Sequence, residues 1–372
     1  NTALEFRALS NDNGRIFADT TDWTLGLYVS KQRQNLDRTY FGNDITSDAV
    51  TGYVTKNSYE TINTAVYGQF DTSLTDKLTL ISGLRAEYWE ADYKDSAGLS
   101  DDPDDWMFGG KLGLEYHISN DHMAYVTLSR GYKAGGINVE PDLNKNYRSF
   151  DTEYLWNLET GLKSFWLDGD LETSVTAFYM LRRDAQVKSS LQYPKDDGSP
   201  GFLDYLENAG QGRNMGLEFG ADWLMNSKFR ALASLGILKA VFDDYDNPEL
   251  ASKGLSLEGR RQAHSPTYQF SLGGEYYISS SWTFKTNIEG KDEFYYSNSH
   301  NQKSGSYAIV NASLEYAKEN WTVTLWGRNL FDKDYYTRGF YWGIDPSSSY
   351  ADRKYVQYGD PRFVGLTVTY DY

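Results

Sequence analysis

The connections between alternating segments constrain this chain more than any other feature of its sequence. Segments in which apolar and polar residues alternate recur along all 372 residues, and tight and long connections follow one another in turn. The tight connections are "SLTDK" at 73–77, "ISND" at 118–121, "LDGD" at 167–170, "MNSK" at 225–228, "ISSS" at 278–281 and "AKEN" at 317–320. The long connections span 35–59, 93–104, 135–150, 191–203, 245–265, 298–304 and 336–360. An up-and-down antiparallel sheet would place all tight turns at one end and all long connections at the other.

The alternation has a period of two, which is the period of a strand that is apolar on one face and polar on the other. The last stretch, "RFVGLTVTYDY", sets Val364, Leu366, Val368, Tyr370 and Tyr372 against small and polar residues. Fifteen such segments are expected, at 1–9, 21–34, 60–72, 76–92, 105–118, 121–134, 151–166, 169–190, 204–225, 228–244, 266–278, 281–297, 305–317, 320–335 and 361–372.

Composition favours a membrane for this sheet. Aromatic residues make up 16% of the chain, yet the mean hydropathy is −0.62 and no apolar run approaches about 18 residues. A closed barrel spans a membrane with alternating strands of roughly 10 residues, which hydropathy windows do not detect. Aromatic residues flank the tight turns, as an interfacial belt requires, at Tyr116, Trp166, Trp223, Phe229, Tyr276, Trp282, Tyr316 and Trp321. All eight prolines fall in long connections or at strand starts.

We therefore predict an all-β fold, an antiparallel up-and-down transmembrane β-barrel. A soluble propeller or sandwich is the alternative, but it would not require the systematic asymmetry of the connections. Side chains expected to face outward, towards lipid, are Leu78, Leu84, Trp156, Leu158, Val310, Leu314, Val323, Leu325, Leu366 and Val368. Those expected to face the lumen are Arg85, Glu87, Glu159, Lys163, Glu218, Glu315 and Arg328.

Charge and residue types argue against several function classes. The net charge of −16 disfavours a nucleic-acid partner, since phosphate binding needs a basic face. The four histidines, His117, His122, His264 and His300, show no metal-ligand spacing, and no catalytic set can be assembled. No catalytic residue, resident metal or cofactor is expected. The acidic run at 101–105 is interpreted as a solvated loop tip, with Ca²⁺ binding as the alternative.

Five stretches, in order along the chain, resemble the TonB-dependent outer-membrane receptors of the siderophore type. They are "SRGYKAGGIN" at 129–138, "EYLWNLETGLKSFWLDGDLETSVTAFY" with the following "DAQV" at 153–187, "ENAGQGRNMGLEFGADW" at 207–223, "LWGRNLFDKDYY" at 325–336 and "GDPRFVGLTVTYDY" at 359–372. The physical role of their glycines and of Asn329 and Asp332 is mainly structural, because these residues suit bulges and the ends of strands.

The resemblance implies a barrel with a plugged lumen, of which residues 1–372 would form the C-terminal portion. About 15 of 22 strands are accounted for, so the barrel is expected to be incomplete, with the plug domain absent. An odd number of strands cannot close in antiparallel fashion. We expect either an open, curved trough with two unpaired edges or an irregular closure around a smaller lumen.

The function implied by the resemblance is TonB-coupled uptake of a scarce solute across the bacterial outer membrane, most readily a ferric siderophore. Ligand-binding side chains are expected at the rim and in the outer loops, at Arg130, Lys133, Tyr341, Trp342, Tyr40 and Tyr193. The implied partners are outer-membrane lipid, the barrel-assembly machinery and TonB, the last through an N-terminal plug region. Tyr370 and Tyr372 resemble the terminal signal that the assembly machinery reads.

Two other function classes stay open at this point. A passive, porin-like channel would share the barrel but have no plug, and a barrel enzyme would need catalytic residues at the outer rim. The ligand itself, whether siderophore, haem, cobalamin or carbohydrate, cannot be read from the sequence, and neither can the oligomeric state.

Overall fold

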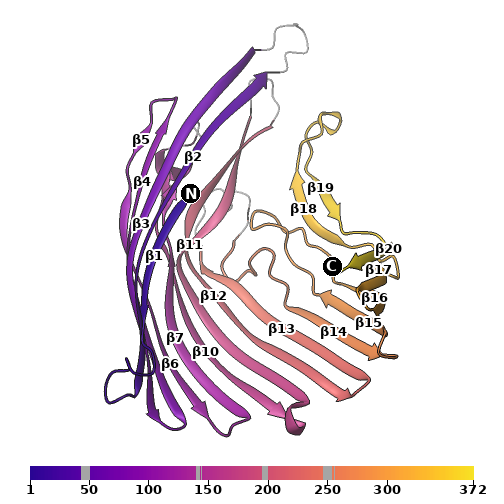
Figure 1. The fold of residues 1–372 in the computed structure, drawn as a ribbon. Helices are drawn as coiled ribbons and strands as arrows, with labels where there is room; N and C mark the ends of the chain where they lie inside the picture. The colour runs from indigo at the N-terminus through magenta and orange to yellow at the C-terminus, as the bar shows by residue number, and fades with distance from the viewer. Residues whose placement is uncertain (43–50, 140–142, 144, 195–199, 246–253, 255) are drawn as a thin grey trace.

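One antiparallel sheet dominates the computed structural model, which describes residues 1–42, 51–139, 143, 145–194, 200–245, 254 and 256–372 (Figure 1). Its main path follows chain order through β1 (Thr2–Leu9), β2 (Thr21–Gly42), β3 (Thr51–Thr75), β4 (Leu78–Asp95), β6 (Asp104–His117), β7 (His122–Lys133), β10 (Glu153–Trp166), β11 (Leu171–Pro194), β12 (Pro200–Asn226), β13 (Phe229–Asp244), β14 (Tyr268–Tyr277), β15 (Trp282–Lys291), β16 (Tyr307–Lys318), β17 (Trp321–Arg328) and β20 (Phe363–Tyr370). The expected up-and-down antiparallel topology is confirmed. Each of the fifteen predicted segments overlaps one strand of this path.

Short strands and 3₁₀ helices form parts of the long connections. They are β5 (Ser100–Asp101) beside β4, β8 (Gly136–Ile137) with β9 (Ser149–Phe150), β18 (Tyr336–Trp342) with β19 (Arg353–Tyr358), and the short 3₁₀ helices η1 (Lys145–Tyr147) and η3 (Pro346–Ser348). A third, η2 (Leu167–Gly169), forms the tight turn between β10 and β11. Within the described ranges, no helix is long and apolar enough to cross a membrane.

The tight connections lie together at one end of the sheet, as predicted. Each tight turn accepts a backbone hydrogen bond from the end of the next hairpin, so the turns form a continuous row (Figure 1). Asp121 O accepts from Phe165 N at 2.8 Å, and Asp170 O, within "LDGD", accepts from Leu224 N at 2.8 Å. Asn320 O, within "AKEN", accepts from Asp371 N at 3.0 Å. The longer connection at 10–20 belongs to this end too, because Thr20 O accepts from Ser73 N at 2.8 Å.

Two of the predicted long connections are mostly taken up by strands of the main sheet. β2 continues to Gly42 and β3 starts at Thr51, so the connection predicted at 35–59 is far shorter. β11 likewise continues to Pro194 and β12 starts at Pro200, so the connection predicted at 191–203 is also shorter. These extensions mix polar and apolar residues on both faces, which hides the alternation in the sequence. A cross-strand ion pair joins the extensions of β2 and β3, between Lys56 and Asp37 at 3.5 Å, and both strands project well beyond their neighbours (Figure 1).

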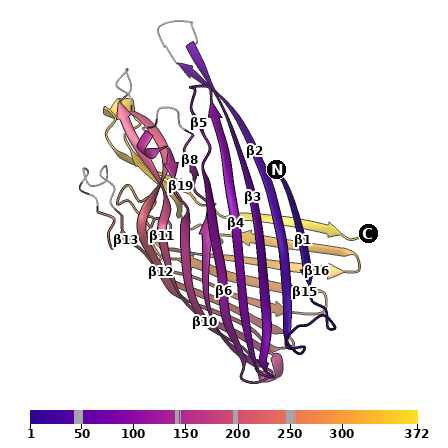
Figure 2. The same ribbon diagram turned by 90° about the vertical axis from the view of Figure 1, so that its left-hand side faces the viewer.

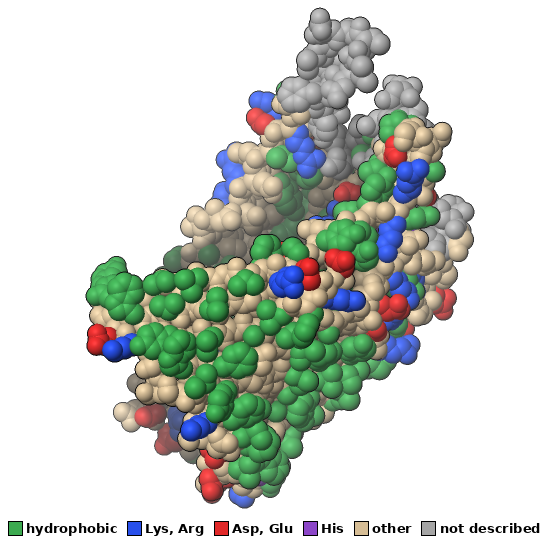
Figure 3. All heavy atoms as spheres, turned by 90° about the vertical axis from the view of Figure 1, so that its right-hand side faces the viewer, with side chains coloured by type: hydrophobic (Ala, Val, Ile, Leu, Met, Phe, Trp, Pro, Cys, Tyr) green, Lys and Arg blue, Asp and Glu red, His purple; other side chains and the backbone are tan. Residues whose placement is uncertain are grey.

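The strand register confirms the two predicted faces. Residues directly opposite one another across a strand pair point to the same side. Leu314, Leu325 and Leu366 form one such row, and Glu315 and Thr324 form the neighbouring row on the other side. Leu84 and Leu366 are 78% and 65% exposed on the outer face. Figure 3 shows hydrophobic side chains gathered in a broad band on this face of the molecule.

The sheet is an open trough, which is one of the two outcomes expected from an odd strand count. β1 pairs only with β2, and β20 pairs only with β17, in the part of the chain that the structure describes. Figures 1 and 2 show the curved sheet with these two strands at its edges. Edge strands leave backbone N–H and C=O groups without partners, which is costly in lipid.

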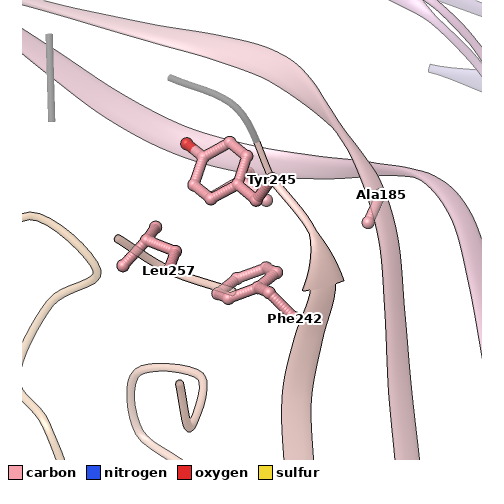
Figure 4. Packing of buried hydrophobic residues seen from close by; sticks show 5 residues of the cluster. Ala185, Phe242, Tyr245 and Leu257 are labelled. Carbon is pink, nitrogen blue, oxygen red and sulfur yellow. The ribbon is translucent and has the colours of Figure 1, made fainter. Parts of the chain in front are cut away.

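Buried hydrophobic residues collect at the end of the long connections rather than between strand faces. The larger cluster comprises Ala185, Val187, Phe242, Tyr245 and Leu257. Figure 4 shows Phe242, Tyr245 and Leu257 grouped beside the strand that carries Ala185, and the Phe242 and Tyr245 ring centroids are 5.1 Å apart. Leu257 belongs to the long connection after β13, so its packing in this cluster holds the connection against β11 and β13.

Candidate functional site

A cavity of about 510 Å³ lies among the long connections, next to the cluster of Figure 4. Five parts of the chain enclose it: β11, β12, the end of the connection after β13, residues 296–300, and β18 with the residues that follow it. Its lining includes Lys188, Asp204, Tyr205, Tyr245, His264, Tyr296, His300, Arg338, Phe340 and Trp342. A mixed aromatic and polar lining of this size is typical of a small-molecule site.

Arg260 holds the connection between β15 and β16 in place. Its guanidinium donates to the carbonyl oxygens of Asn298 at 2.6 Å, Ser297 at 3.3 Å and His300. The same group lies 4.2 Å from the centre of the Tyr295 ring, a cation–π contact. A planar donor that satisfies three carbonyls fixes the backbone on which the cavity-lining residues stand.

His300 lines this cavity and carries a buried hydrogen-bond donor. The residue is 7% exposed, and its Nδ1 accepts from the backbone N–H of Gln302 at 3.2 Å. The proton of the neutral ring therefore lies on Nε2, which has no partner among the described residues. Burial lowers the pKa of His300 to about 4, and the positive charge of Arg260 acts in the same direction. The ring is thus neutral near pH 7.

Tyr296 supplies a second unpartnered donor. It is 4% exposed, and its hydroxyl has no hydrogen-bond partner in the described part of the chain. Burial raises the pKa of Tyr296, so the hydroxyl keeps its proton. The ring lies directly over Gly339, where an added Cβ would come within 2.5 Å of it, so only glycine allows the hairpin to approach so closely.

Positive charge and aromatic surface complete the site. Arg338 lies 5.6 Å from the centre of the Phe340 ring, and no carboxylate of the described residues forms an ion pair with it. Lys188, by contrast, is paired with Asp204 at 2.7 Å. The arrangement offers two fixed donors, one unpaired cation and ring faces. This combination suits a ligand that carries oxygen acceptors or negative charge beside a flat apolar part.

The predicted ligand residues are dispersed in the structure. Trp342 lines the cavity, and the Tyr341 ring lies 5.9 Å from that of His300. Tyr193 is exposed near the tip of the β11–β12 hairpin, opposite Gly201, and does not line the cavity. The side chain of Tyr40 lies outside the described residues.

Arg130 and Lys133 lie away from this cavity. Arg130 is directly opposite Trp156 and therefore on the outer face, not in the lumen or in a loop. Its guanidinium lies 3.9 Å from the centre of the Tyr154 ring. Lys133 is exposed at the end of β7, opposite Glu153.

Sequence reasoning missed the residues that matter most here. The histidines lack metal-ligand spacing, so the sequence gives His300 no predicted role, and no motif marks Tyr296. The stretch "EFYYSNSHNQ" at 293–302 did carry a signal, because it concentrates rings and small hydrogen-bonding residues in one connection. Among the described residues no group of His, Asp or Glu side chains is arranged to hold a metal ion, and this includes the acidic run at 101–105.

The two terminal tyrosines lie at the end of the tight turns. The Tyr370 ring is 4.7 Å from that of Trp321, on the aromatic belt, and Tyr372 is fully exposed. This placement puts both rings at the expected interface. Their reading by assembly machinery stays a prediction.

The fold is a membrane-spanning antiparallel β-sheet with long outer connections, and these connections enclose a cavity that suits a small-molecule ligand. The family described as "TonB dependent receptor-like, beta-barrel" matches residues 2–330, and the chain belongs to that family. This is a family of receptors in the bacterial outer membrane rather than of enzymes.

Relatives and solved structures agree with this assignment. The pesticin receptor of Yersinia pestis is 24% identical over 369 residues, which cover 95% of this chain and 50% of the relative. The crystal structure of the ferric yersiniabactin uptake receptor FyuA from Yersinia pestis matches with a TM-score of 0.78 and 21% identity, over 100% of this chain and 54% of that one. The siderophore receptor PiuA from Acinetobacter baumannii matches with a TM-score of 0.77 and 16% identity, over 100% and 56%. The chain thus spans about half the length of these three proteins.

Proposed function

We propose that this protein takes up a ferric siderophore, or a chelate of similar chemistry, across the outer membrane in a process coupled to TonB. Membership of the receptor family supports the proposal, as do the matched structures, which are described as a ferric yersiniabactin uptake receptor and a siderophore receptor. The chain would supply part of a larger barrel, its C-terminal portion. The open sheet and the half-length coverage of its relatives support the first part of this statement, that the chain belongs to a larger barrel.

One observation carries the proposal beyond family membership. Tyr296 and His300 line the same cavity, and each carries a buried donor, Tyr296 Oη and His300 Nε2, that has no partner among the described residues. A buried polar group without a hydrogen bond costs about 1–3 kcal/mol, so a ligand that satisfies both donors gains that free energy on binding. Siderophores carry the catecholate, hydroxamate or phenolate oxygens that accept such bonds. Trp342 and Phe340 would flank the rings of an aryl chelate.

A binding titration tests the cavity directly. Ferric catecholate, hydroxamate and phenolate siderophores would be added to the purified protein, with quenching of tryptophan fluorescence as the readout. Tyr296→Phe removes one donor and leaves the ring, so it should weaken binding of the cognate chelate about five- to tenfold. Tyr193→Phe, at the hairpin tip outside the cavity, is the matched control and should leave affinity unchanged. Equal affinities for both variants would show that the chelate does not bind in this cavity.

A transport assay tests the energy coupling. Uptake of the same iron-loaded chelate should stop in cells without TonB and return when TonB is restored. A passive channel would continue to admit the chelate in both strains, and that result would favour the porin-like alternative.

A further inference from the structure

A groove on the outer face runs along a row of directly paired residues. Register links Leu25, Gly68, Leu84, Gly110 and Arg130 in succession, and Arg130 then pairs with Trp156. All of them point to one side, the side of the apolar band. The two glycines leave a hollow of about 880 Å³ beside larger apolar side chains, which are Val66, Phe70, Phe108, Leu112 and Leu128.

Arg130 is an unexpected member of this row. Leu84 and Trp156, which share the row, are 78% and 41% exposed, as befits lipid-facing side chains. Arg130 Nη1 donates to Phe108 O at 2.6 Å, and the guanidinium stacks on Tyr154, yet no carboxylate of the described residues forms an ion pair with it. A guanidinium has five N–H donors, so most of them remain available. An unpaired cation that faces the bilayer is costly and usually marks a function.

We propose that this groove binds a phosphate-bearing lipid of the outer leaflet, with an acyl chain along the glycine row and the phosphate on Arg130. Arg130 stands three positions before the end of β7 at Lys133, towards the long connections. These connections form the outer end of the sheet, so the head group would lie at the outer interface. Arginine pairs with phosphate through two parallel N–H donors, which would satisfy the free edge of this guanidinium.

The groove suits a lipid better than a second copy of this chain. Its lining residues include no Asp or Glu, so the same row of a partner copy would offer apolar surface but no anion for Arg130. A phosphorylated lipid supplies both parts at once, a flexible apolar chain and a charged head group. The proposal is independent of the siderophore cavity, since none of the residues that line one lines the other.

Native mass spectrometry of the detergent-purified protein tests this proposal. The probe is bisphosphorylated lipid A, compared with its dephosphorylated form and with inorganic phosphate. Arg130→Gln should weaken retention of the phosphorylated probe about tenfold, the size of one charge-assisted contact. Arg328→Gln, on the lumen face, is the matched control and should bind as the parent protein does.

A second variant examines the apolar part of the groove. Gly68→Leu places a side chain on the groove floor, where the nearest atom to its Cβ is the flexible Leu25 Cδ2 at 2.9 Å and the nearest backbone atom, Thr24 O, is 3.5 Å away, so folding should tolerate it. It should weaken lipid retention while Arg130 remains. The proposal fails if Arg130→Gln retains the phosphorylated probe as well as the Arg328 control does. It also fails if the dephosphorylated probe binds equally well, or if inorganic phosphate alone displaces the lipid.

Discussion

Acidification should loosen the connection that carries His300. The ordinary pKa of a histidine is 6.5, and burial lowers that of His300 to about 4. At a pH between these two pKa values, the His300 ring is protonated when the segment is open and neutral when it is closed. The closed state is therefore favoured fully above pH 6.5 and loses that advantage as the pH falls towards 4.

The size of this effect follows from the two pKa values. The full difference corresponds to about 3 kcal/mol, at about 1.4 kcal/mol for each tenfold change. Lowering the pH from about 7.5 to about 4.5 releases most of it, roughly 2.5 kcal/mol, because the open state is then protonated and the closed state is still mainly neutral. His264, whose pKa burial also lowers, contributes in the same direction.

Hydrogen exchange measures this opening. Peptides that cover 292–306 would be followed over that pH range, with rates corrected for the intrinsic pH dependence of exchange. Protection should fall by roughly seventyfold in the parent protein and by much less in His300→Gln. The exposed His117 at the end of the tight turns provides the matched control, and His117→Gln should behave as the parent. Protection that is independent of pH, or equally sensitive in His300→Gln, would refute the assignment of a neutral buried imidazole.

Three further changes probe other parts of the account. Asn329→Ala should lower the free energy of unfolding by about 2–3 kcal/mol in a denaturant titration. The buried amide of Asn329 donates to Lys333 O and Asp360 O and accepts from Lys333 N, and alanine loses all three hydrogen bonds. A loss no larger than that of an exposed control such as Asn320→Ala would contradict this. Gly343→Ala should disorder the β18–β19 hairpin and speed its cleavage by trypsin, since the new Cβ would lie 1.7 Å from Tyr350 O; unchanged cleavage would show that the hairpin is packed differently. Leu84→Arg should cost about 2–4 kcal/mol in refolding into bilayers and Ser129→Arg, on the lumen face, much less; equal costs would argue against the two faces.

The strands and their faces could be predicted because both depend on local, periodic information. A two-residue alternation specifies which side chains share a face, and tight turns fix where strands reverse. Asn329 and Asp332 illustrate the same point, since both have positive φ and bond the adjoining backbone, as expected where a strand becomes a loop. The exception is the extension of β2 and β3, where polar and apolar residues are mixed on both faces and no apolar face marks the strand.

The site could not be predicted, because it depends on contacts between distant parts of the chain. Tyr296 and His300 line one cavity with Lys188 and Arg338 only after the sheet has set their positions. Their lack of partners cannot be read from residue types. Arg130 shows a related difficulty. The alternation of Val126, Leu128 and Arg130 places it on the outer face, and the register agrees, but the charge of its side chain alone would suggest the lumen.

Scanning β10 with single cysteines tests the central claim most directly, which is that one face of this sheet contacts lipid and the other an aqueous lumen. The chain has no cysteine, so each introduced thiol is unique. In bilayers, a membrane-impermeant thiol reagent should label cysteines at Asn157 and Glu159 and spare those at Leu158 and Thr160. Labelling that rises and falls with a period of two would support the account. Uniform labelling along these four positions, or labelling of the Leu158 and Thr160 positions instead, would contradict it.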